Sequence, residues 1–191
     1  MRNIKLLETT ESERLIIKNA VIEEEIVLQN LCASWKDKEF LEGNAFSKDY
    51  IERGITEGYL PPITNASKDN HRFKSIYLKE EKEIIGLIDL YLGYPNENTL
   101  WIGMFLIGTE YQSKGYAHEA FQLLEKSIVD QKINKIGIGV YLKNWRGLRF
   151  WVKEGFTKIN GIVGDKEFSN ATFSIISLEK ELNVSRETLL D

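Results

Sequence analysis

The sequence predicts an α+β fold, in which a mixed, largely antiparallel central sheet of about seven strands carries helices on both faces. Three neighbouring segments, 73–78, 83–91 and 100–107, are rich in apolar residues and are separated by short polar turns, which predicts an antiparallel meander. Residues 115–130 instead carry apolar side chains at helical spacing, which predicts an amphipathic helix. Because helical and extended segments do not alternate regularly, we expect neither a doubly wound sheet nor a barrel.

The remaining elements follow from the same periodicities and from their interruptions. Pro61-Pro62 ends a helical pattern, and the polar residues 63–71 after it are expected to form a surface loop. From about Glu179 the chain is charged and is expected to be peripheral. The other expected elements, in chain order, are a strand at 13–18, helices at 21–34 and 47–58, a strand at 135–142, a short helix at 144–154, and strands at 156–159 and 172–178.

The composition is that of an ordinary globular protein of a reducing compartment. With 191 residues, 42% of them hydrophobic, the chain can form one core, so we expect a single domain over residues 1–191 with a motif-bearing core at about 13–178. No apolar stretch approaches the roughly 20 residues of a membrane span, and the start of the chain lacks a secretory signal. One cysteine and two histidines predict neither a disulfide nor a metal site. A net charge of −4 argues against a nucleic-acid partner. We therefore expect a cytoplasmic protein, and a homodimer is left open.

The segment Gln112-Ser-Lys-Gly-Tyr-Ala117 has the pattern of an anion-binding loop. An expected strand runs into it and an expected helix leaves it, so the unpaired N–H groups and partial positive charge of the helix start lie here. Gly115 allows the backbone to approach a phosphate closely, and Lys114 adds a charge. The alternative is that these residues serve only the loop and the helix cap. Gly137-Ile-Gly139 lies within an expected strand and lacks a third glycine, so it is not a dinucleotide fingerprint.

With these residues the sequence resembles the GNAT acetyltransferase superfamily, whose acetyl-CoA loop reads Q/R-x-x-G-x-G/A. Asn144-Trp-Arg-Gly-Leu-Arg-Phe-Trp151, followed by Gly155-Phe156, is similar to the family's second signature, N-x-x-A-x-x-F/L-Y and then G-F. The opening Thr10-Glu-Ser-Glu-Arg-Leu-Ile-Ile17 is similar to the branch that includes the ribosomal-protein N-terminal acetyltransferases. The resemblance implies the GNAT acyl-CoA N-acyltransferase fold. It also implies an enzyme that transfers acetyl from acetyl-CoA to a primary amine, either a protein or peptide α-amine or a small amine, by direct attack in a ternary complex. A non-catalytic acyl-CoA-binding or regulatory module is the alternative.

The resemblance also implies roles for individual residues. Main-chain groups of the strand before the loop would pair with the pantetheine arm, and one N–H there would stabilise the oxyanion of the transfer step. Asn144 would bond to the pantetheine arm, although an asparagine before a helix is also a common N-cap. The residues implied to bind the cosubstrate are Phe105, Leu106, Ile107, Gln112, Ser113, Lys114, Gly115, Tyr116, Ala117, Asn144 and Trp151.

Two departures from the family pattern concern proton transfer. Trp151 stands where the family often has a tyrosine acting as general acid, and Trp101 stands where histone-type members have a glutamate base. An indole N–H donates hydrogen bonds but does not release its proton at neutral pH. Deprotonating a lysine-like amine at pH 7 costs about 4.6 kcal/mol, against about 1–1.4 kcal/mol for an α-amine, which favours an acceptor of low pKa.

A more basic amine could still be served by a water wire to solvent or by Asp89 on the preceding strand, although the position of Asp89 favours a hairpin or solvent-facing residue. Tyr91, Trp101 and the loop 61–71 are candidates for the acceptor side of the site, with core packing as the alternative for the tryptophan.

Overall fold

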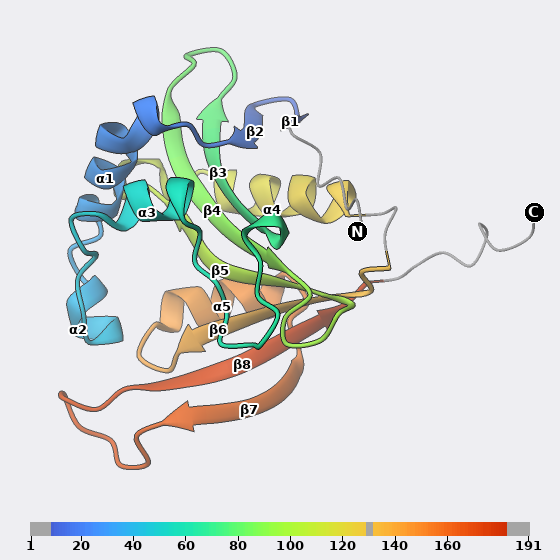
Figure 1. The fold of residues 1–191 in the computed structure, drawn as a ribbon. Helices are drawn as coiled ribbons and strands as arrows, with labels where there is room; N and C mark the ends of the chain where they lie inside the picture. Colours follow the sequence, from blue (N-terminus) through green and yellow to red (C-terminus); the bar gives the residue numbers. More distant parts are fainter. Residues whose placement is uncertain (1–8, 129–131, 183–191) are drawn as a thin grey trace, which may run out of the picture.

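The computed structural model describes residues 9–128 and 132–182, which form eight strands, five α-helices and three short 3-10 helices (Figure 1). In chain order these elements are β1 (Thr9–Glu11), β2 (Leu15–Asn19), η1 (Ile22–Glu24), α1 (Glu25–Ser34), α2 (Lys38–Glu42), α3 (Tyr50–Thr56), η2 (Lys68–Asn70), β3 (His71–Leu78), β4 (Ile84–Leu92), β5 (Thr99–Ile107), η3 (Thr109–Tyr111), α4 (Tyr116–Ser127), β6 (Lys135–Tyr141), α5 (Trp145–Lys153), β7 (Lys158–Gly164) and β8 (Ser174–Glu181).

All eight strands belong to one sheet, in the order β1-β2-β3-β4-β5-β6-β8-β7. Within this sheet β5 and β6 run parallel, and the other neighbouring pairs are antiparallel. The predicted mixed, largely antiparallel sheet is therefore confirmed. The short strand β1 and the five-residue helix α2 were not predicted, because each is too short to show a periodicity. The last predicted positions of the helix at 115–130, residues 129 and 130, lie outside the described residues.

Helices cover both faces of the sheet, as predicted (Figure 1). On one face α1 and α3 contribute Leu28, Leu31 and Ile51 to a core that includes Leu87 and Leu106 of the central strands. On the other face α4 and α5 complete a larger core, whose buried members include Ile85, Ile88, Leu100, Ile102, Ile107, Phe121, Leu124, Trp151 and Phe156. The central strands β4 and β5 are thus covered on both sides, which agrees with their nearly continuous apolar sequences.

An extra residue in β5 changes the direction of its side chains. Asp89 pairs with Met104 and Leu90 with Ile102, so Gly103 has no partner in β4 and forms a β-bulge. Before the bulge the even-numbered Leu100 and Ile102 face the α4–α5 core, whereas after it the odd-numbered Phe105 and Ile107 do so. Side chains three positions apart in a regular strand point to opposite faces. The bulge therefore brings Trp101 and Met104 to the same face, where both line one cavity.

The C-terminal strand extends further than the sequence predicts, and the expectation that residues from Glu179 onward are peripheral is wrong at its first residue. Glu179 is 3% exposed and lies within β8, where it accepts a hydrogen bond from Lys158 Nζ at 2.9 Å and lies 3.2 Å from Lys135 Nζ. The two lysines on the neighbouring strands compensate the buried carboxylate, so a charged residue continues the sheet.

Three further properties bear on function. No helix among residues 9–128 and 132–182 is long and apolar enough to cross a membrane. In the same residues no three histidine, cysteine or acidic side chains gather into a group that could hold a metal ion. The single cysteine, Cys32, is buried in α1, and burial raises the pKa of its thiol to about 12, with Lys38 opposing the shift. A thiol of that pKa is a poor nucleophile at neutral pH.

The core on the α4–α5 face can be tested at one of its fully buried rings. Phe121 is fully buried, and Phe121→Ala should lower the free energy of unfolding by about 3–5 kcal/mol, because it removes the ring and leaves a cavity. Phe168, between β7 and β8, is 88% exposed, so Phe168→Ala should change that free energy by less than about 0.5 kcal/mol. Urea unfolding followed by circular dichroism measures both values. Equal losses in the two variants would contradict the assignment of this core.

Candidate active site

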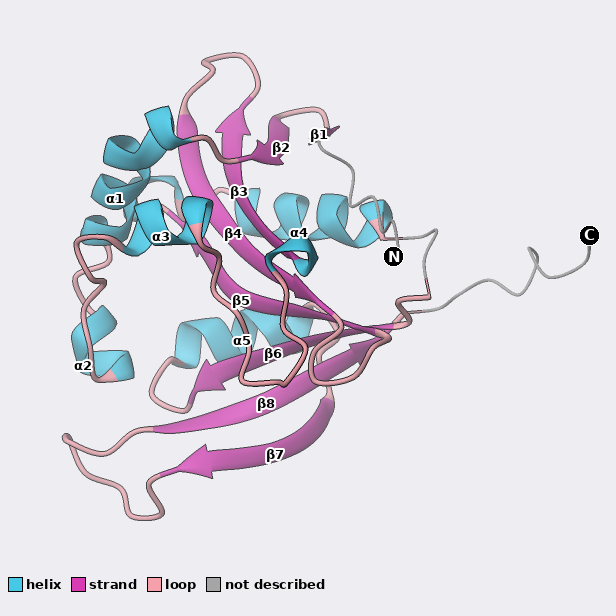
Figure 2. Cartoon of the chain, viewed as in Figure 1, coloured by secondary structure: helices cyan, strands magenta, loops and turns pink. Residues whose placement is uncertain are grey.

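The parallel strands β5 and β6 diverge in the middle of the sheet (Figure 2). They pair only from Thr99 to Ile102 on β5 and from Lys135 to Ile138 on β6. Past Ile102, the edge of β5 that faces β6 has no strand partner among the described residues, although β4 still pairs with its other edge. The strand therefore presents N–H and C=O groups that an extended ligand can bind as if it were another strand. Phe105, Leu106 and Ile107 lie on this edge.

The predicted anion-binding loop joins the end of this edge to α4. The side-chain N–H of Gln112 donates a hydrogen bond to the carbonyl of Ile107 at 2.9 Å, which holds the loop against the strand. Ser113 and Gly115 both have left-handed backbone conformations, with φ of 63° and 84°. Gly115 is the residue immediately before the helix, which begins with Tyr116-Ala117. The turn directs the unpaired N–H groups of the first helical turn outward, as an anion site requires.

Arg14 adds a positive charge beside this loop. Its guanidinium donates a hydrogen bond to the carbonyl of Lys114 at 3.2 Å and lies 4.7 Å from the ring centre of Tyr116. Glu119 holds the other side of the guanidinium, accepting from Arg14 Nε at 2.7 Å. Partial burial would raise the pKa of Glu119, but hydrogen bonds from Ser12 and Arg14 outweigh it and lower that pKa. Sequence reasoning missed Arg14, because about 100 residues separate it from the loop.

The second signature segment forms α5 and the turn before it. Asn144 is the N-cap, since its Oδ1 accepts a hydrogen bond from the N–H of Gly147 at 2.9 Å. Its Nδ2 has no hydrogen-bond partner among the described residues, so the amide can still donate to a ligand. Trp151 is 8% exposed and packs between Phe105 and Phe121, with ring centres 5.4 and 5.5 Å away. It lies in the core beneath β5, where it supports the strand edge.

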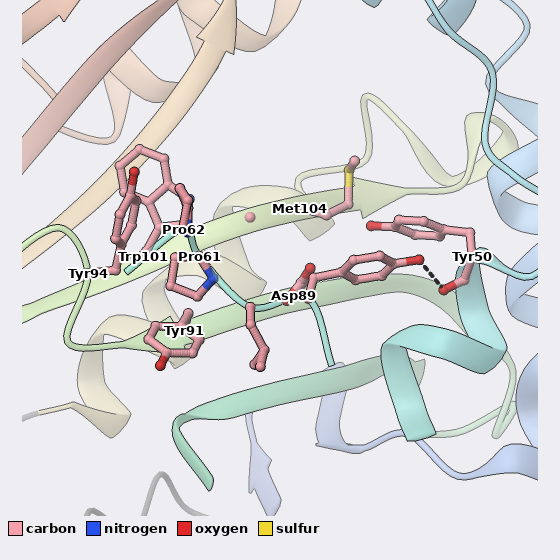
Figure 3. Close-up of a pocket in the computed structure, with 11 residues that line it drawn as sticks. Tyr50, Pro61, Pro62, Asp89, Tyr91, Tyr94, Trp101 and Met104 are labelled. Carbon is pink, nitrogen blue, oxygen red and sulfur yellow. Dashed lines mark hydrogen bonds between the residues drawn. The ribbon is translucent and has the colours of Figure 1, made fainter. Parts of the chain in front are cut away.

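A cavity of about 380 Å³ lies on the α3 side of the sheet, next to the bulge. Figure 3 shows Tyr94 and Trp101 at one end, Tyr50 at the other and Asp89 between them. The segment after α3 closes one side, and β4 and β5 form the other. The lining residues are Tyr50, Tyr59, Leu60, Pro61, Pro62, Asp89, Tyr91, Tyr94, Trp101, Gly103 and Met104. Tyr91, Trp101 and Pro61-Pro62 thus lie together around one cavity, and their place on the acceptor side stays a prediction.

Asp89 is not the solvent-facing hairpin residue that its sequence position favours. It is 5% exposed, and a hydrogen bond of 2.7 Å joins its Oδ1 to Nε2 of the buried His71. Tyr91, and not Asp89, lies directly opposite His71 in the pairing of β3 with β4. The side chains of His71 and Asp89 therefore meet on a diagonal of the sheet. Burial raises the pKa of the Asp89 carboxyl, while the hydrogen bond and charge of His71 oppose the shift. His71 was expected to end the surface loop 63–71, but it is buried and is the first residue of β3. No local pattern in the sequence indicates this pair, because the two residues meet only through the register of β3 and β4.

The glycine at the bulge leaves space beside the second carboxylate oxygen of Asp89. A Cβ atom built on Gly103 would lie 3.2 Å from Oδ2 of Asp89, so a side chain at this position would crowd that oxygen. Gly103 is exposed and is the first β5 residue beyond the pairing with β6. Gly103 therefore adjoins both the carboxylate of Asp89 in the cavity and the free edge of β5.

Known proteins resemble this chain in sequence pattern and in fold. The model of the acetyltransferase (GNAT) family matches residues 34–156. A GNAT-family acetyltransferase from Bacillus anthracis is 20% identical, with a TM-score of 0.67, covering 91% of this chain and 98% of that one. Spermidine N-acetyltransferase from Vibrio cholerae, solved with CoA and spermine, is 17% identical, with a TM-score of 0.67 and coverages of 91% and 98%. The ribosomal L7/L12 alpha-N-protein acetyltransferase RimL, solved with coenzyme A, is 16% identical, with a TM-score of 0.67 and coverages of 93% and 99%. No curated protein matches the sequence.

The buried pair of His71 and Asp89 can be tested through stability. His71→Leu leaves a buried carboxylate without its partner and should lower the free energy of unfolding by about 1–3 kcal/mol. His71→Gln keeps an N–H donor of similar reach and should lose less. Urea unfolding at pH 7 compares the two variants. If both lose the same free energy, the hydrogen bond to Asp89 does not stabilise the fold.

Proposed function

Since the chain belongs to the acetyltransferase (GNAT) family, we propose that it transfers the acetyl group of acetyl-CoA directly to a primary amine bound beside Asp89. The observation that carries the proposal is the junction at Gly103, where the unpaired edge of β5 meets the carboxylate of the cavity. An acyl donor paired with that edge and an amine held by that carboxylate would meet at this point. Bringing two reactants together in this way is a large part of catalysis in a two-substrate reaction.

The residues around the diverging strands fit acetyl-CoA, which supplies the activated acetyl thioester. The N–H groups at the start of α4, with Lys114 and Arg14, would hold the pyrophosphate. The free edge of β5 at Phe105–Ile107 and the side-chain amide of Asn144 would bind the pantetheine arm. Gln112, Ser113, Gly115, Tyr116 and Ala117 would shape the loop, and Trp151 would support β5 from below.

In the proposed reaction Asp89 removes the proton that makes the bound amine an ammonium ion. Its raised pKa brings the carboxylate nearer to the operating pH of a general base, and His71 orients it and supports its charge. The neutral amine then forms the new N–C bond as the C–S bond breaks, and the electron pair of that bond leaves with the sulfur. The second proton of the nitrogen passes to the departing thiolate or to water, which leaves the neutral amide. A thiol of pKa near 8.5 needs little protonation to depart, so the absence of a tyrosine at Trp151 does not block the step.

Asp89 changes which acceptors are expected. Without a base in the site, an amine of low pKa would be required, as the substitutions at Trp101 and Trp151 suggest from sequence alone. A buried carboxylate with a histidine partner extends the range to ordinary alkylamines, whose deprotonation it assists. The same pair also favours an enzyme over a binding module, because binding of CoA alone has no use for a base in the acceptor cavity.

Other expectations from the sequence stay predictions. These are the single domain over residues 1–191, the cytoplasmic location, the absence of a nucleic-acid partner and of a metal, and the open question of a homodimer. None of them alters the proposed chemistry.

The proposed phosphate loop can be tested by charge at one position. CoA should raise the melting temperature of the protein, because it binds only the folded state. Gly115→Asp should lower CoA affinity more than about tenfold relative to Gly115→Asn, since both residues tolerate a left-handed backbone but only aspartate repels the phosphates. Isothermal titration calorimetry measures the two affinities. Equal CoA affinities in the two folded variants would show that the pyrophosphate does not bind at this loop.

The proposed base can be tested with acceptors of different pKa. Asp89→Asn should lower kcat/KM about 10²–10⁴-fold for an alkylamine, and far less for an amine that is already neutral at the assay pH. In the unchanged enzyme kcat/KM should rise with pH as Asp89 loses its proton, at a higher pH than for an ordinary aspartate. The variant should lack this rise and follow only the ionisation of the amine. An equal loss with both kinds of amine would show that Asp89 is not the base.

A further inference from the structure

The acceptor cavity has an unusual balance of side chains, with many aromatic rings and one charged group. Five of its lining residues are tyrosine or tryptophan, and Leu60, Met104 and the two prolines add further apolar surface. Asp89 is the one acidic or basic side chain among the described lining residues. Apolar walls with few polar groups are typical of small-molecule sites, and a volume of about 380 Å³ lies in their usual range.

The end of the cavity that lies away from Tyr50 is built around Trp101. Its cross-strand neighbour in β6 is Gly137, where a Cβ atom would lie only 2.9 Å from the indole. A Cβ atom on Gly139 would lie 3.5 Å from the same ring. The two glycines therefore leave room for the indole to lie across β6, which accounts for the Gly-Ile-Gly segment that is not a dinucleotide motif. Tyr94 meets the indole edge to face, with ring centres 5.1 Å apart.

The charged group of the cavity is flanked by aromatic rings. Asp89 lies between the two aromatic ends of the cavity, with Tyr50 on one side and Trp101 on the other (Figure 3). The hydroxyl of Tyr91 accepts a hydrogen bond from the N–H of Ser67 at 3.0 Å, which holds the segment after Pro61-Pro62 against the sheet. A ligand that places a cation at Asp89 therefore meets rings on either side of it.

We propose that the acceptor is a compact primary amine that carries a single amino group on an aromatic body, bound with its amine at Asp89 and its ring against Trp101 and Tyr94. This inference rests on the proposed function and narrows its substrate class. An aromatic ring gains contact area and edge-to-face interactions with both side chains. The ammonium ion gains the carboxylate of Asp89 and the faces of nearby rings.

The same features disfavour the other common amine classes. A polyamine carries two or more ammonium groups, and the cavity offers one carboxylate, so a second ammonium group gains no ionic partner among the lining residues. A protein α-amine arrives with an extended backbone, whose N–H and C=O groups need several hydrogen-bond partners. Apart from Asp89, the lining side chains offer only the tyrosine hydroxyls and one indole N–H. The hydroxyls of Tyr59 and Tyr91 already bond to backbone groups of Tyr50 and Ser67. Specificity would thus come partly from contacts with the preferred amine and partly from polar or charged groups of other amines that find no partner in the cavity.

The test compares four acceptors by rate and by binding. The probes are 2-phenylethylamine, n-propylamine, spermidine and an alanine tripeptide, with CoA-thiol release as the rate and calorimetry on the CoA-saturated protein as the binding readout. We expect kcat/KM for 2-phenylethylamine to exceed that for each other probe at least about tenfold. Faster acetylation of spermidine or of the tripeptide would overturn the inference while leaving the proposed acetyl transfer intact. No binding of 2-phenylethylamine to the CoA-saturated protein would overturn it too. If CoA itself does not bind and no probe is acetylated, the proposed function fails as well.

A matched set of variants tests whether the aromatic ring of the acceptor binds against Trp101. Trp101→Ala should reduce the ratio of kcat/KM for 2-phenylethylamine to that for n-propylamine by about tenfold or more, and Trp101→Phe by less than about threefold. Phe168→Ala, which removes an exposed ring outside the cavity, should leave the ratio unchanged. CoA affinity and melting temperature serve as controls for folding. An unchanged ratio in a folded Trp101→Ala variant would show that the acceptor does not use this end of the cavity.

Discussion

The bulge at Gly103 reverses the side-chain alternation of β5, and the arrangement of the site depends on this reversal. Because of it, Trp101 and Met104 share the face that carries Asp89, while Phe105 and Ile107 return to the core on the other face. The bulge also coincides with the point where β6 leaves β5. A regular strand could still pair with β4. Either its cavity-lining side chains or its core-facing side chains would then point to the wrong face of the sheet.

The two halves of the site differ in the kind of group that provides binding. On the cosubstrate side the groups are backbone donors and acceptors, with Lys114 and Arg14 as added charge, so many side-chain sequences could build it. On the acceptor side the groups are specific side chains around one buried carboxylate. This division explains how one fold accommodates different amines, since the acceptor walls can change while the backbone sites remain.

Sequence patterns predicted most of the fold, because the meander and the helix at 115–130 have clear periodicities. Local spacing also pointed to the loop at Gln112–Ala117, whereas Asn144 was singled out through the resemblance of its segment to the second GNAT signature. Sequence patterns failed for the pair of His71 and Asp89, which lie 18 residues apart and meet only through strand register. Arg14 and Gly103 were missed for related reasons: the first reaches its loop across the sheet, and a bulge has no signature in a single sequence beyond a glycine.

The burial of Cys32 has a practical consequence for enzymology. It is the only cysteine in the chain, it is 1% exposed, and its pKa of about 12 leaves almost no thiolate at neutral pH. Aromatic disulfide reagents, which report free thiolates by colour, should therefore react with released CoA and hardly with the folded protein. A continuous assay of this kind would have little background from the protein. With acetyl-CoA left out, a slow rise in colour would instead report unfolding that exposes Cys32.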